Sequence, residues 1–259
     1  MIGNLIDVNV NLSRWPFRRL PFDTVPELVK KLRSRGVEQA WAGSFDGLLH
    51  RDVAAVNERL AAQCEGQGNG LLVPFGTVNP MLPDWEEDLR RCDEDHKMPG
   101  VRLHPNYHQY SLDDERFRKL LQLAGERGLI VQLAVLMEDE RTQHPLVQVP
   151  HVNVAPLPAA LKEAPGVRVV LLNAHRAVRG KTFLQMVATE RIWFDISNLE
   201  SVGGVSKILA QAPPDKILFG SHAPFFILES ALLKLRESDL DEAQLEAIAL
   251  TNARKLLRG

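Results

Sequence analysis

Eight short β-rich runs, spread along the whole chain, constrain the fold of this sequence more than any other feature. The runs lie at residues 5–11, 37–43, 70–78, 100–104, 129–136, 167–174, 192–197 and 216–221. Segments with helical spacing separate them, as at Phe117, Leu120, Leu121 and Ala124. Strands that alternate with helices in this way pair in parallel through right-handed crossovers.

Eight such units in 259 residues favour a closed barrel, because a (β/α)8 barrel takes roughly 250 residues. We therefore predict an α/β fold, a single (β/α)8 TIM barrel over residues 1–259 with a closing helix at 240–258. An open doubly wound sheet is the alternative. No Gly-rich dinucleotide loop follows the first run, which argues against that alternative.

The charge balance and the apolar runs narrow the classes of partner. Lys and Arg number 31 against 33 acidic residues, so the net charge of −2 gives no footprint for nucleic acid or an anionic membrane. No apolar run approaches the roughly 20 residues that span a bilayer, and no secretory signal is evident. Cys64 and Cys92 have no metal-knuckle or disulfide spacing. We expect a soluble, cytoplasmic protein.

Polar residues gather where the predicted strands end. Asp7, Asn9 and Asn11 alternate along the first strand and so share one of its faces. Three histidines follow alternate strands, and two charged residues lie on strands nearby: His104, His175 and His222, with Arg102 and Asp195. The carboxyl ends of barrel strands carry the chemistry of barrel enzymes, so these residues are candidates for an active site.

Each candidate also has a purely structural interpretation. A histidine at a strand end often holds a loop through its ring N–H. Asn9 and Asn11 could bond neighbouring backbone, and Arg102 could neutralise an interior carboxylate such as Asp195. The basic loop that begins at Arg14 could bind an anionic substrate or simply lie in solvent. Residues 137–156 are long and Pro-broken for a connection, which is typical of a functional loop.

Four motifs, in order, resemble the amidohydrolase-related barrels. They are GVRLHP at 100–105, NAH at 173–175, ILFGSHAPF at 217–225 and NARKLL at 252–257. The resemblance runs nearly end to end. The family includes metal-dependent decarboxylases of the aminocarboxymuconate-semialdehyde type and lactone hydrolases, so the resemblance implies hydrolase or decarboxylase chemistry.

The same resemblance shows where this chain departs from the family. The first strand of the family carries two metal-binding histidines, and here those positions are Asn9 and Asn11. The ligand histidine of strand five falls near Ala134, and the aspartate of strand eight is His222. Only His175 keeps the residue type of the family. Amide oxygens are weak zinc ligands, so we predict that the inherited metal site is lost and that no cofactor is bound.

These residues suggest a function. We expect hydrolysis of a lactone, ester or amide, or decarboxylation, of a small anionic, carboxylated substrate. The candidate catalytic residues are His175, His222 and His104, and the candidate substrate-binding residues are Asn9, Asn11, Arg14, Arg102 and Asp195. Two alternatives stay open. One is a divalent metal held by the three histidines, and the other is a catalytically degenerate barrel that binds or regulates. A homodimer is possible, since many such barrels dimerise.

Overall fold

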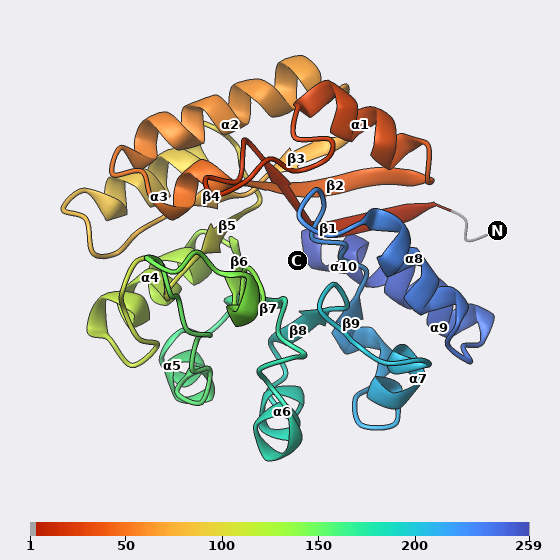
Figure 1. Cartoon of the computed structure of the whole chain (residues 1–259). Coiled ribbons are helices and arrows are strands. Elements are labelled where there is room, and N and C mark those ends of the chain that lie inside the picture. The colour runs from red at the N-terminus through yellow and green to blue at the C-terminus, as the bar shows by residue number, and fades with distance from the viewer. Residues whose placement is uncertain (1–3, 259) are drawn as a thin grey trace.

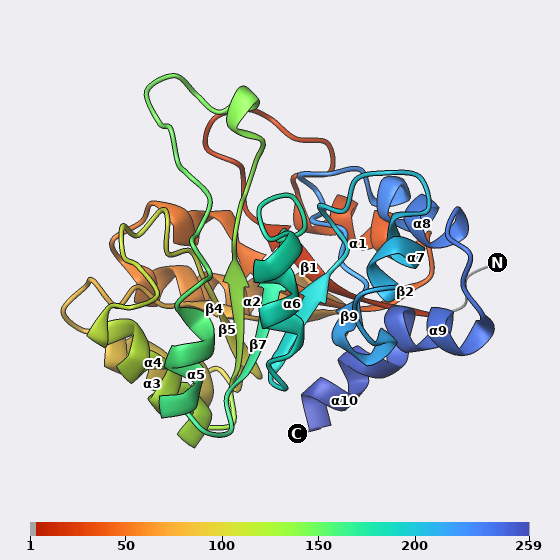
Figure 2. The same ribbon diagram turned by 90° about the horizontal axis from the view of Figure 1, so that it is seen from below.

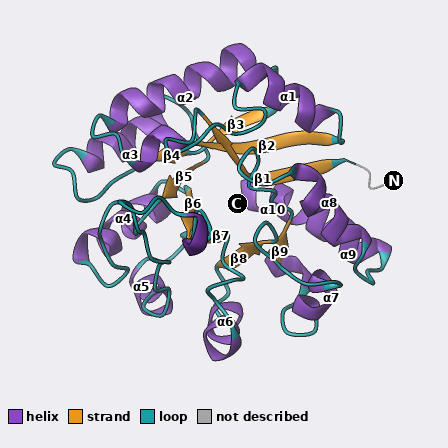
Figure 3. Cartoon of the chain, in the orientation of Figure 1, coloured by secondary structure: helices purple, strands orange, loops and turns teal. Residues whose placement is uncertain are grey.

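The computed structural model describes residues 4–258 and shows a ring of parallel strands surrounded by helices (Figures 1 and 3). The strands are β1 (Leu5–Leu12), β2 (Val37–Ser44), β3 (Leu72–Pro74), β4 (Gly76–Thr77), β5 (Gly100–Leu103), β6 (Ile130–Ala134), β7 (Arg168–Leu172), β8 (Ile192–Asp195) and β9 (Ile217–Leu218). The helices are α1 (Val25–Arg33), α2 (Val53–Gln67), α3 (Trp85–Glu94), α4 (Glu115–Glu126), α5 (Leu157–Glu163), α6 (Gly180–Val187), α7 (Gly204–Leu209), α8 (Leu228–Arg236), α9 (Glu242–Glu246) and α10 (Asn252–Arg258). Short helical turns are η1 (Phe45–Leu48), η2 (Glu140–Thr142), η3 (Pro214–Lys216) and the π-helical η4 (Ala247–Thr251).

The strands close into one barrel through two junctions. They pair in the orders β1-β2-β3 and β4 through β9. At the first junction, β3 and β4 are two pieces of one strand, and the N–H of Phe75 between them donates to the carbonyl of Ala42 at 2.8 Å. At the second junction, Val8 N donates to Phe219 O at 3.0 Å and Asn11 N donates to Ala223 O at 2.8 Å. The predicted (β/α)8 barrel is therefore confirmed.

The C-terminal segment covers the amino-terminal end of the barrel, as Figure 2 shows for α10. We predicted one helix at 240–258, and the structure has α9, the turn η4 and α10 in succession. Asn252 Nδ2 donates to the carbonyls of Ile217 and Pro214, at 2.8 Å each. Ala253 and Leu256 pack against Ile6 and Val8 at the base of the barrel. The segment thus closes one end, and the candidate residues lie at the other.

Two loops rise together above the carboxyl ends of the strands (Figure 2). One joins β1 to α1, and the other is residues 137–156, which contain η2 and otherwise no regular structure. Arg18 Nη1 of the first loop donates to Glu138 Oε2 of the second at 3.2 Å. No helix among residues 4–258 combines the length and apolar character needed to cross a membrane.

Candidate active site

Arg102 occupies the middle of the barrel, fully buried and surrounded by acceptors. Its Nε donates to Gln132 Oε1 at 2.8 Å, and Nη1 donates to Asn11 Oδ1 and to Val10 O, both at 2.8 Å. Nη2 donates to Trp41 O at 3.0 Å, with a longer contact to another β1 carbonyl. Burial lowers the pKa of Arg102 to about 9, so the guanidinium is still charged at neutral pH. Each guanidinium nitrogen thus donates to an acceptor of the protein itself.

The β2 strand leaves room for that guanidinium at Gly43. A Cβ built on Gly43 would lie 2.8 Å from Arg102 Cδ and 2.8 Å from its Nη1. Real Cβ atoms do not approach other atoms so closely, so a side chain at this position would displace the arginine. Gly43 is therefore part of the Arg102 site.

Asn9 lies beside this cation and acts as a hydrogen-bond donor. Its Nδ2 is 2.8 Å from Asn173 Oδ1 and 2.7 Å from Asp195 Oδ2, with Ser197 Oγ at 3.4 Å. Asp195 Oδ1 accepts from the backbone N–H of Asn173 at 2.9 Å. Burial raises the pKa of Asp195, while its bonds to Ser197 and Asn9 oppose the rise. The structure therefore brings Asn9, Asn11, Arg102 and Asp195 into one buried network.

Asp7 begins the same face of β1 and is fully buried. Its carboxyl accepts from the N–H groups of Asn9 and Ser221, at 3.1 and 2.9 Å, and from the Ser221 hydroxyl. Burial raises the pKa of Asp7 to about 7, against the effect of those bonds. This carboxyl ties β1 to the end of β9, which is a structural role.

His222 stands at the end of the last strand with both ring nitrogens engaged. Its Nε2 lies 2.9 Å from Met137 O, which can only accept, so the ring proton is on Nε2. The other nitrogen, Nδ1, then accepts from Asn11 Nδ2 at 3.2 Å. Burial lowers the pKa of His222 to about 3. Its backbone has φ of 59°, a strained conformation for a non-glycine residue and one often found at functional sites.

His104 contrasts with His222, because neither of its ring nitrogens has a partner within the described chain. Both are buried, and the residue is 1% exposed. Its ring centroid lies 5.9 Å from that of His108, whose Nε2 donates to Gly47 O at 2.9 Å while its Nδ1 is also unpaired. Burial, with His108, Arg102 and His222 nearby, holds the pKa of His104 well below its usual range. This imidazole is therefore neutral and unsatisfied.

His175 lies outside the barrel, contrary to its predicted place in an interior set. Its ring centroid is 5.8 Å from that of Phe183 on α6 and 5.7 Å from that of Phe194. Both phenylalanines belong to the core between the sheet and the helices. The residue that points into the barrel at this strand end is Asn173, whose φ of 55° breaks the strand alternation. Burial lowers the pKa of His175 to about 4.

Aromatic side chains roof the site. Trp15 packs edge-to-face on Phe45 and Phe225, at centroid distances of 5.3 and 4.9 Å, and is itself buried. The guanidinium of Arg18 lies 4.7 Å from the Phe225 centroid. Arg14 is outside this roof, with 63% of its side chain exposed. Beneath the roof, the candidate residues of the barrel interior are each at most 1% exposed.

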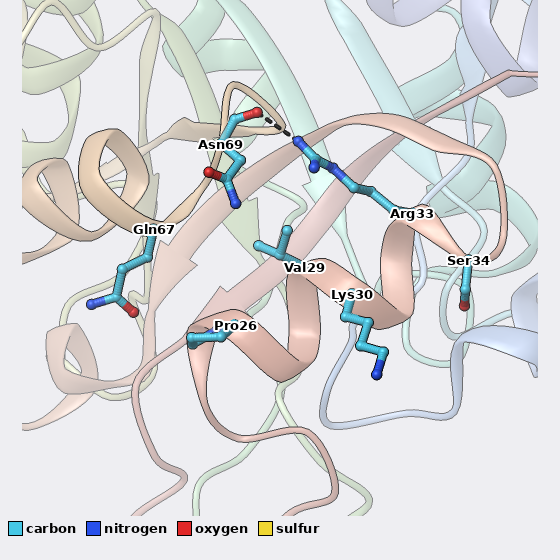
Figure 4. A pocket seen from close by; sticks show the side chains of 7 residues that line it. All are labelled: Pro26, Val29, Lys30, Arg33, Ser34, Gln67 and Asn69. Carbon is cyan, nitrogen blue, oxygen red and sulfur yellow. Dashed lines mark hydrogen bonds between the residues drawn. The ribbon is translucent and has the colours of Figure 1, made fainter.

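A separate cavity lies away from these residues. It has a volume of about 640 Å³ and lies between α1 and the C-terminal end of α2 (Figure 4). Its lining includes Lys30, Arg33 and Gln67 but no His, Cys, Asp or Glu. None of the candidate residues lines this cavity, so it is separate from the candidate site.

A comparison with known protein families places the chain. The model of the family described as amidohydrolase matches residues 13–259. The chain belongs to the amidohydrolase family. This assignment confirms the resemblance drawn from the four motifs, and with it the predicted class, an amidohydrolase-superfamily enzyme that is a hydrolase or a decarboxylase. No curated protein sequence matches this chain.

Solved structures share the fold of this amidohydrolase-family chain at low sequence identity. The 2,6-dihydroxybenzoate decarboxylase from Rhizobium has a TM-score of 0.75 at 14% identity, covering 99% of each chain. The 5-carboxyvanillate decarboxylase from Novosphingobium aromaticivorans, with bound manganese, has a TM-score of 0.75 at 11% identity, covering 99% of this chain and 97% of that one. A dihydroxybenzoic acid decarboxylase from Polaromonas, also with manganese, has a TM-score of 0.72 at 12% identity, covering 99% of this chain and 97% of that one.

The residues of this chain do not fit such a metal. Asn9 presents its N–H₂ group to Asn173 and Asp195, and Asn11 Oδ1 already faces the Arg102 cation. His222 has no free lone pair. Among residues 4–258, no three His, Cys, Asp or Glu side chains approach one another closely enough to share a metal ion. The rearranged three-histidine site is therefore not formed, and His175 faces away from it.

Sequence reasoning missed several members of this site. Gln132, Asn173 and Ser197 complete the buried network. Gly43 leaves room for Arg102, and His108 lies beside His104. Gln132 had a signal, since a glutamine stands inside the apolar run at 129–136, the fifth of the eight. Polar residues inside apolar runs are the feature that would have found it.

Proposed function

We propose that this chain is a metal-independent hydrolase or decarboxylase for a small carboxylated substrate, with Arg102 as the built-in cation of the barrel. The observation that carries the proposal is His104, an imidazole buried at a strand end with both nitrogens unpaired. Buried polar groups are nearly always satisfied, so an orphan beside a fixed cation points to a missing ligand. In a barrel enzyme, the ligand expected there is the substrate.

The state of His104 suits proton transfer. The ring is neutral, because burial holds its pKa far below neutrality, and a neutral imidazole can accept a proton at one nitrogen and donate at the other. The ring of His222 cannot exchange its proton as freely, since Met137 and Asn11 hold it in one tautomer. We assign His104 the proton-handling role and His222 the role of fixing Asn11 and the loop after β6.

The substrate class follows from the mouth of the barrel. Arg14, which is mostly exposed, brings positive charge to the rim, whereas Arg18 is paired with Glu138. Guanidinium groups pair well with carboxylates. The roof of Trp15, Phe45 and Phe225 offers flat aromatic surfaces. The structural neighbours include decarboxylases named for aromatic acids. These features together favour an aromatic carboxylate or a lactone that bears a carboxylate.

The test is a screen of the purified full chain, with and without EDTA, against benzoate-type acids, aryl esters and carboxylated lactones. We expect turnover that EDTA leaves unchanged and that His104→Asn lowers by about 10²-fold or more. The control is His151→Asn, since His151 is half exposed on the 137–156 loop. Turnover that survives His104→Asn, or that requires added manganese, would contradict the proposal.

One observation favours a second candidate function, a barrel that binds without catalysis. All the donors of Arg102 are used by the protein, and the roof is closed in this structure. A binding module would show saturable uptake of a carboxylate with no turnover of any member of the panel. The homodimer and the cytoplasmic location remain predictions, and sedimentation and fractionation would test them.

A further inference from the structure

A second cavity lies at the rim of the barrel, between α6 and α7, which are neighbours in the ring (Figures 1 and 3). It has a volume of about 310 Å³, and the imidazole of His175 lines it. Apolar side chains, among them Phe183 and Ile208, form part of the wall. Its polar lining comes from the loops after β7 and β8 and from α7, and neither Arg102 nor His104 lines it.

His175 is unsatisfied in this wall. The residue is 6% exposed, and its Nε2 is buried and bonds nothing within the described chain. A neutral imidazole nitrogen either donates or accepts one hydrogen bond, according to the tautomer. The missing partner at Nε2 is therefore a polar group that can do either, such as a hydroxyl group.

Two cations border the same cavity without protein partners for their charged ends. Arg179 is held in place by its Nε, which donates to His175 O at 3.2 Å. Its Nη atoms, like the Nζ of Lys207, bond no side chain or carbonyl among residues 4–258. Glu200 also lines the cavity. Its Oε1 is 3.7 Å from Nη1 of Arg176, a residue that does not line the cavity. The balance of charge at the cavity is positive.

The start of α6 adds donors to this positive end. The helix begins at Gly180, which lines the cavity, and no side chain caps its first turn. The free N–H groups of a helix N-terminus favour an anion. These donors lie beside Arg179. Groups that bind an anion and a group that binds a hydroxyl therefore face the same small cavity.

We propose that the cavity between α6 and α7 binds a small hydroxylated anion, with its phosphate or carboxylate at Arg179, Lys207 and the start of α6 and its hydroxyl at His175 Nε2. The volume admits a molecule of the size of glycerol 3-phosphate. Binding at this site does not require turnover in the barrel. Its test therefore gives a result that does not depend on the proposed enzyme function.

The experiment is calorimetric titration of the full chain with glycerol 3-phosphate and with inorganic phosphate. We expect saturable binding of glycerol 3-phosphate at least about tenfold tighter than that of phosphate, since one buried hydrogen bond distinguishes them. Arg179→Gln and Lys207→Gln should each weaken glycerol 3-phosphate binding by about tenfold or more. His175→Phe should retain the phosphate affinity and lose the preference for the hydroxylated probe.

The matched control is Lys181→Gln, which removes the same charge from α6 at a position that does not line the cavity. We expect its affinity to stay within about twofold of the parent, as for a screened surface charge. Equal losses in Lys181→Gln and Arg179→Gln would overturn the site in favour of general attraction. Equal affinity for the two probes, or no saturable binding at millimolar concentration, would overturn it as well. Because Arg179 and Lys207 are exposed, their variants test the proposal even if His175→Phe fails to fold.

Discussion

The two sides of the barrel interior treat their buried polar groups in opposite ways. On the side of β1, Asn9 and the guanidinium of Arg102, which reaches across from β5, bond protein acceptors with all of their donors. On the other side, past the end of β5, His104 lacks any partner, and His108 lacks one at Nδ1. The difference separates two roles. The satisfied side is internal scaffolding, and the unsatisfied side is where a ligand would complete the structure.

Removal of the guanidinium should have the largest effect. Arg102→Met leaves the carbonyls of Val10 and Trp41 and the amide oxygens of Asn11 and Gln132 without a donor. We expect the free energy of unfolding to fall by about 3–5 kcal/mol, measured by urea denaturation. Arg14→Met is the control, because that side chain is mostly exposed, and it should change stability by less than about 0.5 kcal/mol. Similar losses of unfolding free energy in both variants would show that Arg102 does not stabilise the barrel.

Crowding the guanidinium should have a smaller effect of the same kind. Gly43→Ala places a Cβ within contact distance of Arg102, and we expect a loss of about 1–3 kcal/mol. The same change at Gly66 in α2 meets no atom within 4 Å. That substitution should stabilise the protein by up to about 1 kcal/mol, because alanine is the better helix former. Urea titrations of both variants would settle the contrast, and a neutral Gly43→Ala would contradict it.

The pH dependence tests whether His222 is buried as a neutral ring. Its pKa is about 3 when folded, against an ordinary value near 6.5 in the unfolded chain. The unfolded chain therefore takes up a proton below pH 6.5 that the folded chain refuses, so His222 costs stability as the pH falls. Between pH 7 and pH 5 the cost is roughly 2 kcal/mol. His222→Gln should lose that much less stability than the parent over this range.

Asp7 acts in the opposite direction, since its pKa of about 7 favours the folded state as the pH falls. It is present in both the parent and His222→Gln, so comparing the two proteins removes its contribution. An unchanged pH dependence in the variant would show that His222 titrates normally.

The smallest effect on stability is expected at the unsatisfied end. His104→Asn breaks no hydrogen bond, so we expect a change in the free energy of unfolding below about 1 kcal/mol. His222→Asn is the matched variant, and it should cost more because it breaks the bonds to Asn11 and Met137. If His104→Asn proves the more destabilising of the two, His104 has a structural role and the contrast between the two sides fails.

The sequence predicted the barrel well because its evidence is periodic. Eight runs, with helical spacing between them, determine the order of elements whatever the details of packing. The strand alternation predicted that Asp7, Asn9 and Asn11 share one face of the first strand. Asn9 and Asn11 do join one interior network, although the pairing of β1 shifts register between Asp7 and Val10.

The prediction for His175 failed at the point where periodicity ends. Val170 and Leu172 of β7 face the interior, so continued alternation places residue 175 on the outer face. The left-handed backbone at Asn173 turns the Asn173 side chain inward instead, and no local pattern signals that change.

The sequence also could not predict which candidate side chains are hydrogen-bonded within the protein. Whether Arg102 binds substrate or supports the barrel depends on Trp41 and Gly43 of β2 and on Gln132 of β6, strands far from β5 or from each other in sequence. Residues of the same type, His104 and His222, differ only in partners supplied by distant segments. Composition and spacing identify such groups, and only the assembled fold shows which of them are satisfied.

We propose that Arg102 and its network stand where relatives hold a metal. The most direct measurement is elemental analysis of the full chain, purified without chelator and again after exposure to manganese and zinc. We expect no stoichiometric metal in either sample. Near-stoichiometric metal that is lost in His222→Ala would contradict it and restore the inherited site.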